Sequence, residues 1–266
     1  MIEHYEPKDW RTLQDGVCRI FNEIGLNAET DKEITTPRWK VTLDVFAIDP
    51  GSVDNIQYIV ECKNWNRPIP QSVIHSFVTV IHEVGANIGY IISKHGFQKG
   101  AIEYLKNTNI KALTFKDFQK HYMKIWVDRY FCKMIRDVSG SLIQYTEPIN
   151  SYRERYVQTL SDTQRQKFFE LYKKYSLFGM VLAAISVRHL MPELIPRPDI
   201  TVSNLNKVIE KTLGSEAKIE TLFLRDYLNR LIKVIQKITN KFNDVFGKDI
   251  FARQAAPPDR CSPRAS

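Results

Sequence analysis

The sequence has few of the features that mark zinc-binding, secreted and membrane proteins. Its four cysteines are scattered and none forms a C-x-x-C pair, so neither a zinc ribbon nor a disulfide framework is indicated. No apolar stretch follows a basic start, which argues against a secretory signal. The longest apolar run, LFGMVLAAISV (residues 177–187), is too short to span a bilayer, which needs about 20 residues. We therefore expect a soluble, cytoplasmic protein with no membrane partner.

The charge is unevenly distributed along a chain whose composition is that of a folded protein. Of its 266 residues, 43% are hydrophobic and 26% are charged, proportions that are typical of folded domains. Residues 1–127 carry 15 basic and 15 acidic side chains, whereas residues 128–266 carry 23 and 15, the whole of the net charge of +8. A basic half favours polyanionic partners through neutralisation of phosphates. Lysine-rich, solvated helix faces explain the same excess equally well.

The first half of the chain alternates between helix and strand patterns. Apolar residues at helical spacing predict helices over residues 10–24, 71–84, 96–109 and 116–126. Strands are predicted over residues 40–49, 56–65, 87–93 and 110–115. The first two strands flank the turn-forming segment PGSVDN and are expected to pair antiparallel, and the last two are continuously apolar, as in strands buried on both faces. This order predicts an α/β fold, a small mixed sheet flanked by helices on both faces.

From about residue 128 only helical patterns follow. Helices are predicted over residues 151–175, 176–191, 201–213 and 215–247. The last has an apolar stripe that consists of Ile219, Leu222, Leu228, Leu231, Ile235, Ile238 and Phe242. Its length suggests a helical hairpin, a bundle spine or a dimer seam. We expect three parts: a catalytic domain at residues 1–127, a basic all-helical domain at 128–250 and a disordered tail at 251–266.

Three charged residues on the first two predicted strands form the candidate site. Because side chains alternate along a strand, Glu61 and Lys63 project from one face, and an antiparallel partner brings Asp44 to the same face. Two carboxylates at close range repel each other, and a divalent cation such as Mg²⁺ or Mn²⁺ removes that conflict. Lys63 is then placed to activate a water for attack on a phosphodiester. The alternative is a surface salt-bridge cluster at a sheet edge, which E-x-K by itself more often signifies.

Five segments in a fixed order carry a family resemblance: IFNEIGLNAE, LDVFAID, VECKNW, VIHEVGANIGYIIS and GFQKGAIEYL. Over about residues 10–125 they resemble the Mrr-like restriction endonucleases of the PD-(D/E)xK nuclease superfamily. The resemblance implies a restriction-endonuclease-like fold for this mixed sheet and its helices. It also implies Asp44 and Glu61 as metal-binding carboxylates and Lys63 as the water-activating base. It implies the backbone carbonyl of Cys62 as a further metal ligand and Mg²⁺, with Mn²⁺ as a substitute, as the cofactor.

Five other residues complete the predicted site. Family members often have a glutamate in the first helix, where this chain has Gln14, an amide that can orient a water or a metal ligand but supplies no charge. A second metal ion is therefore in doubt. Arg38 and Lys40 lie at the entry to the first predicted strand and are candidate contacts to a DNA backbone. Lys94 and Lys99 flank a turn into a helix, where free N–H groups favour phosphate; a solvated loop is the alternative.

The expected function is that of a metal-dependent DNA endonuclease of restriction or defence type. The helical domain is expected to bind DNA, to form a homodimer or to sense a trigger such as a partner from a defence system. One alternative is a non-cleaving nucleic-acid-binding or regulatory module on a nuclease fold. Another is a nuclease effector that a partner or ligand of the helical domain activates.

Overall fold

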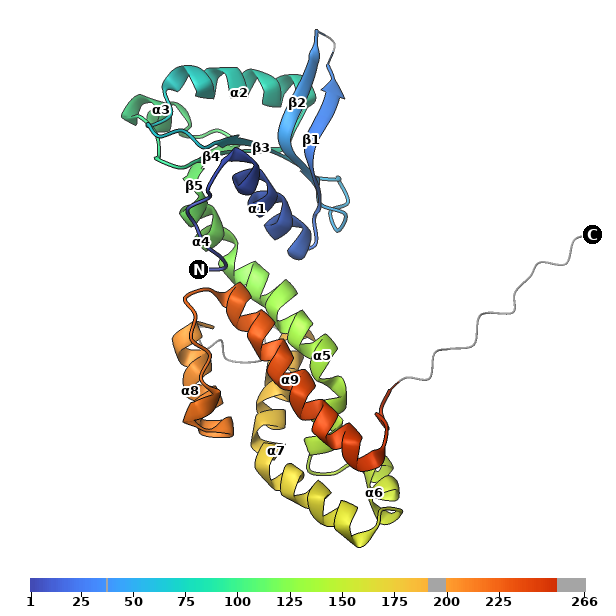
Figure 1. Cartoon of the computed structure of the whole chain (residues 1–266). Helices are drawn as coiled ribbons and strands as arrows, with labels where there is room; N and C mark the ends of the chain where they lie inside the picture. Colours follow the sequence, from blue (N-terminus) through green and yellow to red (C-terminus); the bar gives the residue numbers. More distant parts are fainter. Residues whose placement is uncertain (37, 191–199, 253–266) are drawn as a thin grey trace, which may run out of the picture. The chain divides into compact units, whose positions relative to one another are not determined.

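The computed structural model describes residues 1–36, 38–190 and 200–252 of the chain (Figure 1). The chain forms two compact units. Unit 1 comprises Met1–Lys133 together with Thr221–Tyr227, and unit 2 comprises the described parts of Met134–Glu220 and Leu228–Ser266. A short segment from the second half of the chain therefore belongs to unit 1. The predicted C-terminal tail lies outside the described residues from position 253 onward.

Unit 1 is built on a five-stranded sheet with the strand order β1-β2-β3-β4-β5. The strands are β1 (Asn27–Thr35), β2 (Lys40–Ile48), β3 (Gln57–Lys63), β4 (Ile88–Ser93) and β5 (Ile110–Thr114). The first three strands pair antiparallel, and the last three pair parallel. The predicted mixed sheet is thereby confirmed, including the antiparallel pairing of the two strands that carry Asp44 and Glu61.

Strand β1 was not predicted from the sequence. Its side chains alternate between exposed and half-buried and none is fully buried, so the segment lacks the apolar alternation that identifies a strand. The strand is held by its backbone pairing with β2, which runs from Asn27 opposite Ile48 to Thr35 opposite Lys40. In its middle, Asp31 has a left-handed φ of 53°, which is uncommon for a residue with a side chain.

Four helices cover the two faces of the sheet. They are α1 (Trp10–Glu23), α2 (Gln71–Val84), α3 (Lys99–Tyr104) and α4 (Phe115–Trp126). Figure 1 shows α1 and α4 on one face and α2 and α3 on the other. The ends of these helices follow local chemistry. Asp9 caps α1 by accepting a hydrogen bond from the backbone N–H of Thr12 at 2.7 Å, and Gly85 ends α2 in the left-handed conformation that favours glycine.

The two faces of the sheet have different cores. Beneath α2 and α3 the core is mainly aliphatic and includes Ile59, Ile74, Phe77 and Ile91. On the other face, Phe21 of α1 contacts the rings of four residues: Tyr58, Tyr90, Phe118 and Tyr122. Each fully buried side chain of this size stabilises the fold by about 1.5–3 kcal/mol. Strands β3 and β4 are thus packed on both faces.

Unit 2 contains helices and no strand among its described residues, as the fold class predicts. Its elements are α5 (Cys132–Thr146), which begins in unit 1, α6 (Ser151–Gln158), α7 (Asp162–Leu190), α8 (Val202–Leu213), a 3₁₀ turn (Ser215–Ala217) and α9 (Leu224–Phe246). Aromatic rings form the centre of the unit, where Tyr145 stacks on Phe242 with 5.1 Å between ring centroids. None of the described helices combines the length and the apolar character needed to cross a membrane.

The bounds of two predicted helices of this region were wrong. The helix predicted over residues 151–175 is two helices, because Ser161 begins a new one: its hydroxyl accepts from the Gln164 N–H and donates to the Gln164 side chain. The helix predicted from residue 215 begins at Leu224 instead. The N–H groups of Leu224 and Arg225 donate to the carbonyls of Met1 and Ile2, which satisfies the first turn. Leu222, predicted in the apolar stripe, is 81% exposed.

Candidate active site

The candidate site lies where strands β2 and β3 separate. Their pairing runs from Ile48 opposite Gln57 to Val45 opposite Val60 and ends there. Beyond the last pair, the backbone N–H of Cys62 donates at 2.6 Å to Oδ2 of Asp44. The Asp44 carboxylate therefore takes an N–H that the ladder leaves without a backbone partner, and this bond fixes the carboxylate against β3.

Glu61 and Lys63 meet Asp44 at this point. Continuing the register by one residue places Glu61 opposite Asp44, and the Lys63 ammonium forms an ion pair with Oε1 of Glu61. Burial, and next the negative charge of Glu61, raise the pKa of Asp44 from its ordinary value of 3.8 to about 6. The Cys62 N–H, the Lys63 charge and a hydrogen bond from the Trp10 side chain oppose this rise in pKa. The Glu61 carboxylate is thus close enough to hinder the ionisation of Asp44.

Gln14 of α1 connects the site to β1. Its side chain is fully buried, and its Nε2 donates to the backbone carbonyl of Asp44 at 2.8 Å and to Asp44 Oδ1 at 3.4 Å. The same nitrogen lies 3.3 Å from Oδ1 of Asp31, and Oε1 of Gln14 accepts from Arg11 at 3.4 Å. Arg11 also pairs with Asp31 at 2.5 Å. The amide therefore turns its donor toward Asp44, as a group that orients the carboxylate does.

The site has the donor set for one hard cation. Asp44 and Glu61 supply carboxylate oxygens, the ligands that Mg²⁺ and Mn²⁺ prefer, and Mg²⁺ usually retains several waters beside one or two carboxylates. The raised pKa of Asp44 follows from burial and from the nearby Glu61 carboxylate, a repulsion that a bound cation relieves. Among residues 1–36, 38–190 and 200–252, no three His, Cys, Asp or Glu side chains gather as a metal-binding group. The residues fit a single cation better than a pair.

Comparison with known proteins assigns this part of the chain to a family. Residues 7–122 match the family model Mrr_cat, whose description is restriction endonuclease. Residues 7–122 are an Mrr-type restriction endonuclease domain. No curated protein matches the chain with significant similarity. One solved structure, titled as protein of unknown function AF1548, is 13% identical to this chain. The alignment covers 88% of this chain and 98% of that protein, with a TM-score of 0.35. This likeness is too weak to add to the assignment.

The predicted DNA contacts occupy different parts of the Mrr-type domain. Lys94 follows β4 and lies at the end of β3: its backbone N–H donates to the Lys63 carbonyl at 3.2 Å, and its Nζ donates to Asn66 Oδ1 at 3.1 Å. Arg38 lies in the connection between β1 and β2, where its Nη1 is 3.3 Å from Oε1 of Glu83. Lys40 is the first residue of β2. Lys99 begins α3 and its side chain is 91% exposed. Lys94 is thus the predicted contact that adjoins the Mrr-type site.

Three residues near the Mrr-type site were not singled out as functional in the sequence. Asp31 lies in the unpredicted strand β1, where the pairs on either side of it place it opposite Asp44. Trp10 and Arg11 begin α1, which was predicted only as a helix with a buried apolar face. A strand with an acidic residue in its middle was the available signal for Asp31. The helix period placed Trp10 among core residues, but its side chain is 41% exposed.

Cys62 has a backbone role beside the Mrr-type site. Its thiol is buried, and burial raises the pKa of that thiol well above its ordinary value, so it is unsuited to act as a nucleophile. Its N–H holds Asp44. Its carbonyl remains a predicted metal ligand.

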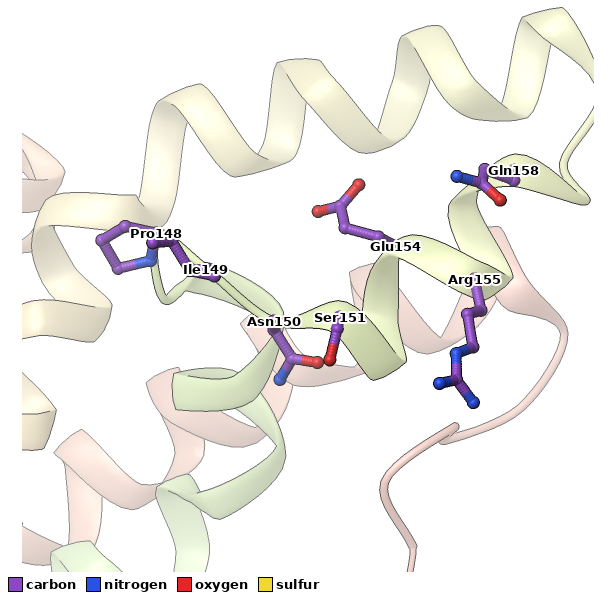
Figure 2. A pocket seen from close by; sticks show the side chains of 7 residues that line it. All are labelled: Pro148, Ile149, Asn150, Ser151, Glu154, Arg155 and Gln158. Carbon is purple, nitrogen blue, oxygen red and sulfur yellow. The ribbon is translucent and has the colours of Figure 1, made fainter.

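Unit 2 has a surface hollow of about 500 Å³ around the start of α6. Figure 2 shows its lining, which consists of Pro148, Ile149, Asn150, Ser151, Glu154, Arg155 and Gln158. The Glu154 carboxylate and the Arg155 guanidinium point to opposite sides of the helix (Figure 2). Divergent charges of this kind build no reacting centre, and the candidate site of the chain is the one in the Mrr-type domain.

Proposed function

We propose that the chain is a divalent-cation-dependent endonuclease that hydrolyses phosphodiester bonds of DNA in restriction or defence. The observation that carries the proposal is the meeting of Asp44, Glu61 and Lys63 at the point where β2 and β3 separate. A surface salt-bridge cluster does not account for it. Asp44 is half-buried beside Glu61 and its pKa is raised, a combination that is found more often at functional sites than in surface ion pairs.

Each residue has a role in the proposed reaction. Asp44 and Glu61 hold Mg²⁺, with Mn²⁺ as a substitute, together with the carbonyl of Cys62. When bound, the cation supplies Lewis-acid stabilisation of the negative charge that develops at the phosphate. Lys63, released from Glu61, holds the attacking water at Nζ and helps to deprotonate it. Gln14 supports the site by keeping the Asp44 carboxylate in place.

The proposal extends to the partners of the chain. Residues 1–127 cut, and the basic residues 128–250 bind DNA, join two copies of the chain or sense a trigger from a defence system. Arg38, Lys40, Lys94 and Lys99 contact the DNA backbone. A homodimer supports the proposal because cutting both strands of a duplex generally takes two active sites. The reaction takes place in the cytoplasm.

Cleavage assays with single-residue variants test the proposal. Supercoiled and linear DNA are incubated with the full chain and Mg²⁺ or Mn²⁺. Asp44→Ala and Lys63→Ala are expected to lower the cleavage rate at least a hundredfold, because each removes a group that acts in the reaction. Asp54→Ala and Lys106→Ala, at exposed positions of the same unit, are matched controls that retain the wild-type rate. Cleavage that persists in both site variants overturns the proposal.

The two alternative functions predict different results in the same assay. A non-cleaving nucleic-acid-binding module binds DNA in a salt-dependent manner, shows no turnover with any cation and is unaffected by a chelator. An effector that needs activation cleaves only after a ligand or partner of residues 128–250 is added.

A further inference from the structure

A second cavity adjoins the proposed catalytic lysine. It has a volume of about 400 Å³, and we call it the indole cleft. Its lining includes Lys8, Asp9, Trp10, Lys63, Asn64 and Trp65. Lys63 and Trp65 also line a smaller pocket of about 220 Å³ that includes Glu61. A ligand in the indole cleft is therefore next to the place where the phosphate reacts.

Two tryptophans give the indole cleft aromatic walls. The Trp10 side chain is 41% exposed, and the guanidinium carbon of Arg11 lies 5.3 Å from its ring centroid. Trp65 is partly buried against the core beneath α2, with Arg67 at 5.3 Å and Lys63 at 5.9 Å from its ring. Indole rings that border a cavity and are accompanied by cations are the means by which proteins stack bases and neutralise the flanking phosphates.

Asn64 of the same lining carries an unused hydrogen-bond acceptor. Its Oδ1 is buried and has no hydrogen-bond partner among the described residues, although buried acceptors are nearly always satisfied. The edge of a nucleobase carries N–H donors, and asparagine is a residue that reads base edges. Because Asn64 lines the cavity, a base that enters the indole cleft meets its amide group.

The charges favour a base over a phosphate inside the indole cleft. Asp9 is part of the lining, and its carboxylate is held ionised by the N–H and hydroxyl of Thr12, which lower its pKa. A fixed negative charge disfavours phosphate, which is itself an anion. Lys8 and Lys63 supply the positive charge that the adjoining phosphates need.

We propose that the indole cleft binds an unpaired nucleobase of the DNA strand next to the bond that is cut. The inference rests on the proposed nuclease function and specifies its substrate as DNA that has an unstacked nucleotide at the cleavage site. A base inside a duplex presents only its edges to a protein, so contact with an indole face requires a base outside the stack. Extruding a paired base is costly, and an already unpaired base avoids that cost.

A binding experiment separates this inference from catalysis. The full chain, kept from cutting by EDTA, is titrated with two duplexes that differ at a single position. In one duplex the fluorescent base 2-aminopurine is paired with thymine, and in the other it faces an abasic site. We expect about tenfold tighter binding of the unpaired form, together with a change in its fluorescence, because stacking on a tryptophan contributes that much.

Variants assign the preference to the indole cleft. Trp65→Leu and Asn64→Leu are expected to bind both duplexes with the affinity that the wild type has for the paired one. Trp65→Phe, which keeps an aromatic ring for packing and stacking, retains part of the preference and guards against loss of folding. Trp39→Leu is the matched control, because Trp39 is 49% exposed and lies in the connection between β1 and β2, outside the indole cleft. This variant is expected to retain the full preference for the unpaired base.

The outcomes distinguish this inference from the proposed function. Equal affinity of the wild type for both duplexes overturns the inference, as does a preference that survives in both Trp65→Leu and Asn64→Leu. If the chain with Mg²⁺ still cuts fully paired DNA in that case, the nuclease proposal stands. A chain that neither binds nor cuts DNA overturns both.

Discussion

The side-chain nitrogen of Gln14 lies 2.8 Å from the backbone carbonyl oxygen of Asp44 and donates a hydrogen bond to it. Gln14 therefore acts on the carboxylate of Asp44 through the strand that carries it. Because the amide is neutral, it adds no third negative charge beside Asp44 and Asp31. The consequence for stability and cation binding can be tested directly.

Replacing this amide by a carboxylate should make the fold dependent on a cation. Gln14→Glu places a buried negative charge against Asp44 and Asp31, and we expect a loss of about 2–4 kcal/mol in metal-free protein. Mg²⁺ should restore much of that loss. Thermal unfolding with EDTA and with Mg²⁺ measures it. Gln119→Glu is the control, since Gln119 is also fully buried but lies on α4; an equal rescue of both variants by Mg²⁺ would argue against the prediction.

Removing the Asp44 charge should stabilise the metal-free protein at neutral pH. The pKa of Asp44 is raised from 3.8 to about 6 in the folded state, so the stability it contributes is present below pH 4 and is lost as the pH rises through 6. Asp44→Asn escapes this loss. We expect it to be about 1–2 kcal/mol more stable than wild type at pH 7.5, allowing for solvent screening, and equal at pH 4. Urea unfolding in EDTA measures both; a less stable variant at pH 7.5 contradicts the prediction.

Cation binding should weaken as the pH falls below 6. A proton on Asp44 competes with the cation for the same oxygens, and the pKa of about 6 sets where the competition begins. We expect the affinity for Mn²⁺ to be nearly constant from pH 7 to 8 and to fall up to about tenfold per pH unit below 6. Titration calorimetry at several pH values measures it. Affinity that is the same at pH 5 and pH 7.5 would show that Asp44 is not a ligand.

Asp31 should support catalysis without touching the substrate. Its carboxylate holds Arg11 at 2.5 Å and lies 3.3 Å from the Gln14 nitrogen that donates to Asp44. Loss of such a supporting group typically costs about 10–100-fold in activity. We expect Asp31→Ala to lower kcat by about tenfold and leave KM for DNA nearly unchanged, while Asp31→Asn, which tolerates the left-handed backbone, loses less. Asp54→Ala serves as the control, and a change confined to KM would contradict the role.

Arg225 should be essential for the stability of unit 1. Its guanidinium contacts Glu3 at 2.7 Å and forms an ion pair with Glu23, and the three side chains are 9–16% exposed. Arg225→Ala leaves the partly buried Glu23 carboxylate without its cation and leaves Glu3 with Arg19 alone, which costs about 3–5 kcal/mol. Lys120→Ala breaks a pair whose partners are 58% and 48% exposed and should cost less than about 1 kcal/mol. Urea unfolding compares them, and equal losses would contradict the prediction.

The sequence predicted those parts of the fold whose pattern is local. Alternation along 40–49 and 56–65 predicted the antiparallel pair that brings Asp44 beside Glu61, because the face of a side chain in a strand follows from its position alone. Strand β1 was missed because its stability comes from backbone pairing with β2, which leaves no apolar pattern. The start of α9 at Leu224 was missed because the carbonyls that satisfy its first turn belong to Met1 and Ile2, far away in sequence.

The candidate site shows the same division. Gln14 was found by its spacing from a recognisable helix end, and its burial against Asp44 depends on how α1 packs. Asp31 is opposite Asp44 only because β1 exists. Trp10 carries a helix-period position that predicts a core residue, yet its side chain reaches Asp44 and borders a cavity. Contacts that join separate elements required the structure.

The segment Thr221–Tyr227 limits how the gene for this protein can be divided by recombination. Because it belongs to the unit formed by residues 1–133 and carries the arginine that binds Glu3 and Glu23, the gene segment for the nuclease half is not contiguous. Recombination that transfers only the codons for residues 1–133 to another gene would produce a domain without Arg225, the partner of Glu3 and Glu23. The two halves are therefore expected to travel through evolution together, as one exchangeable block.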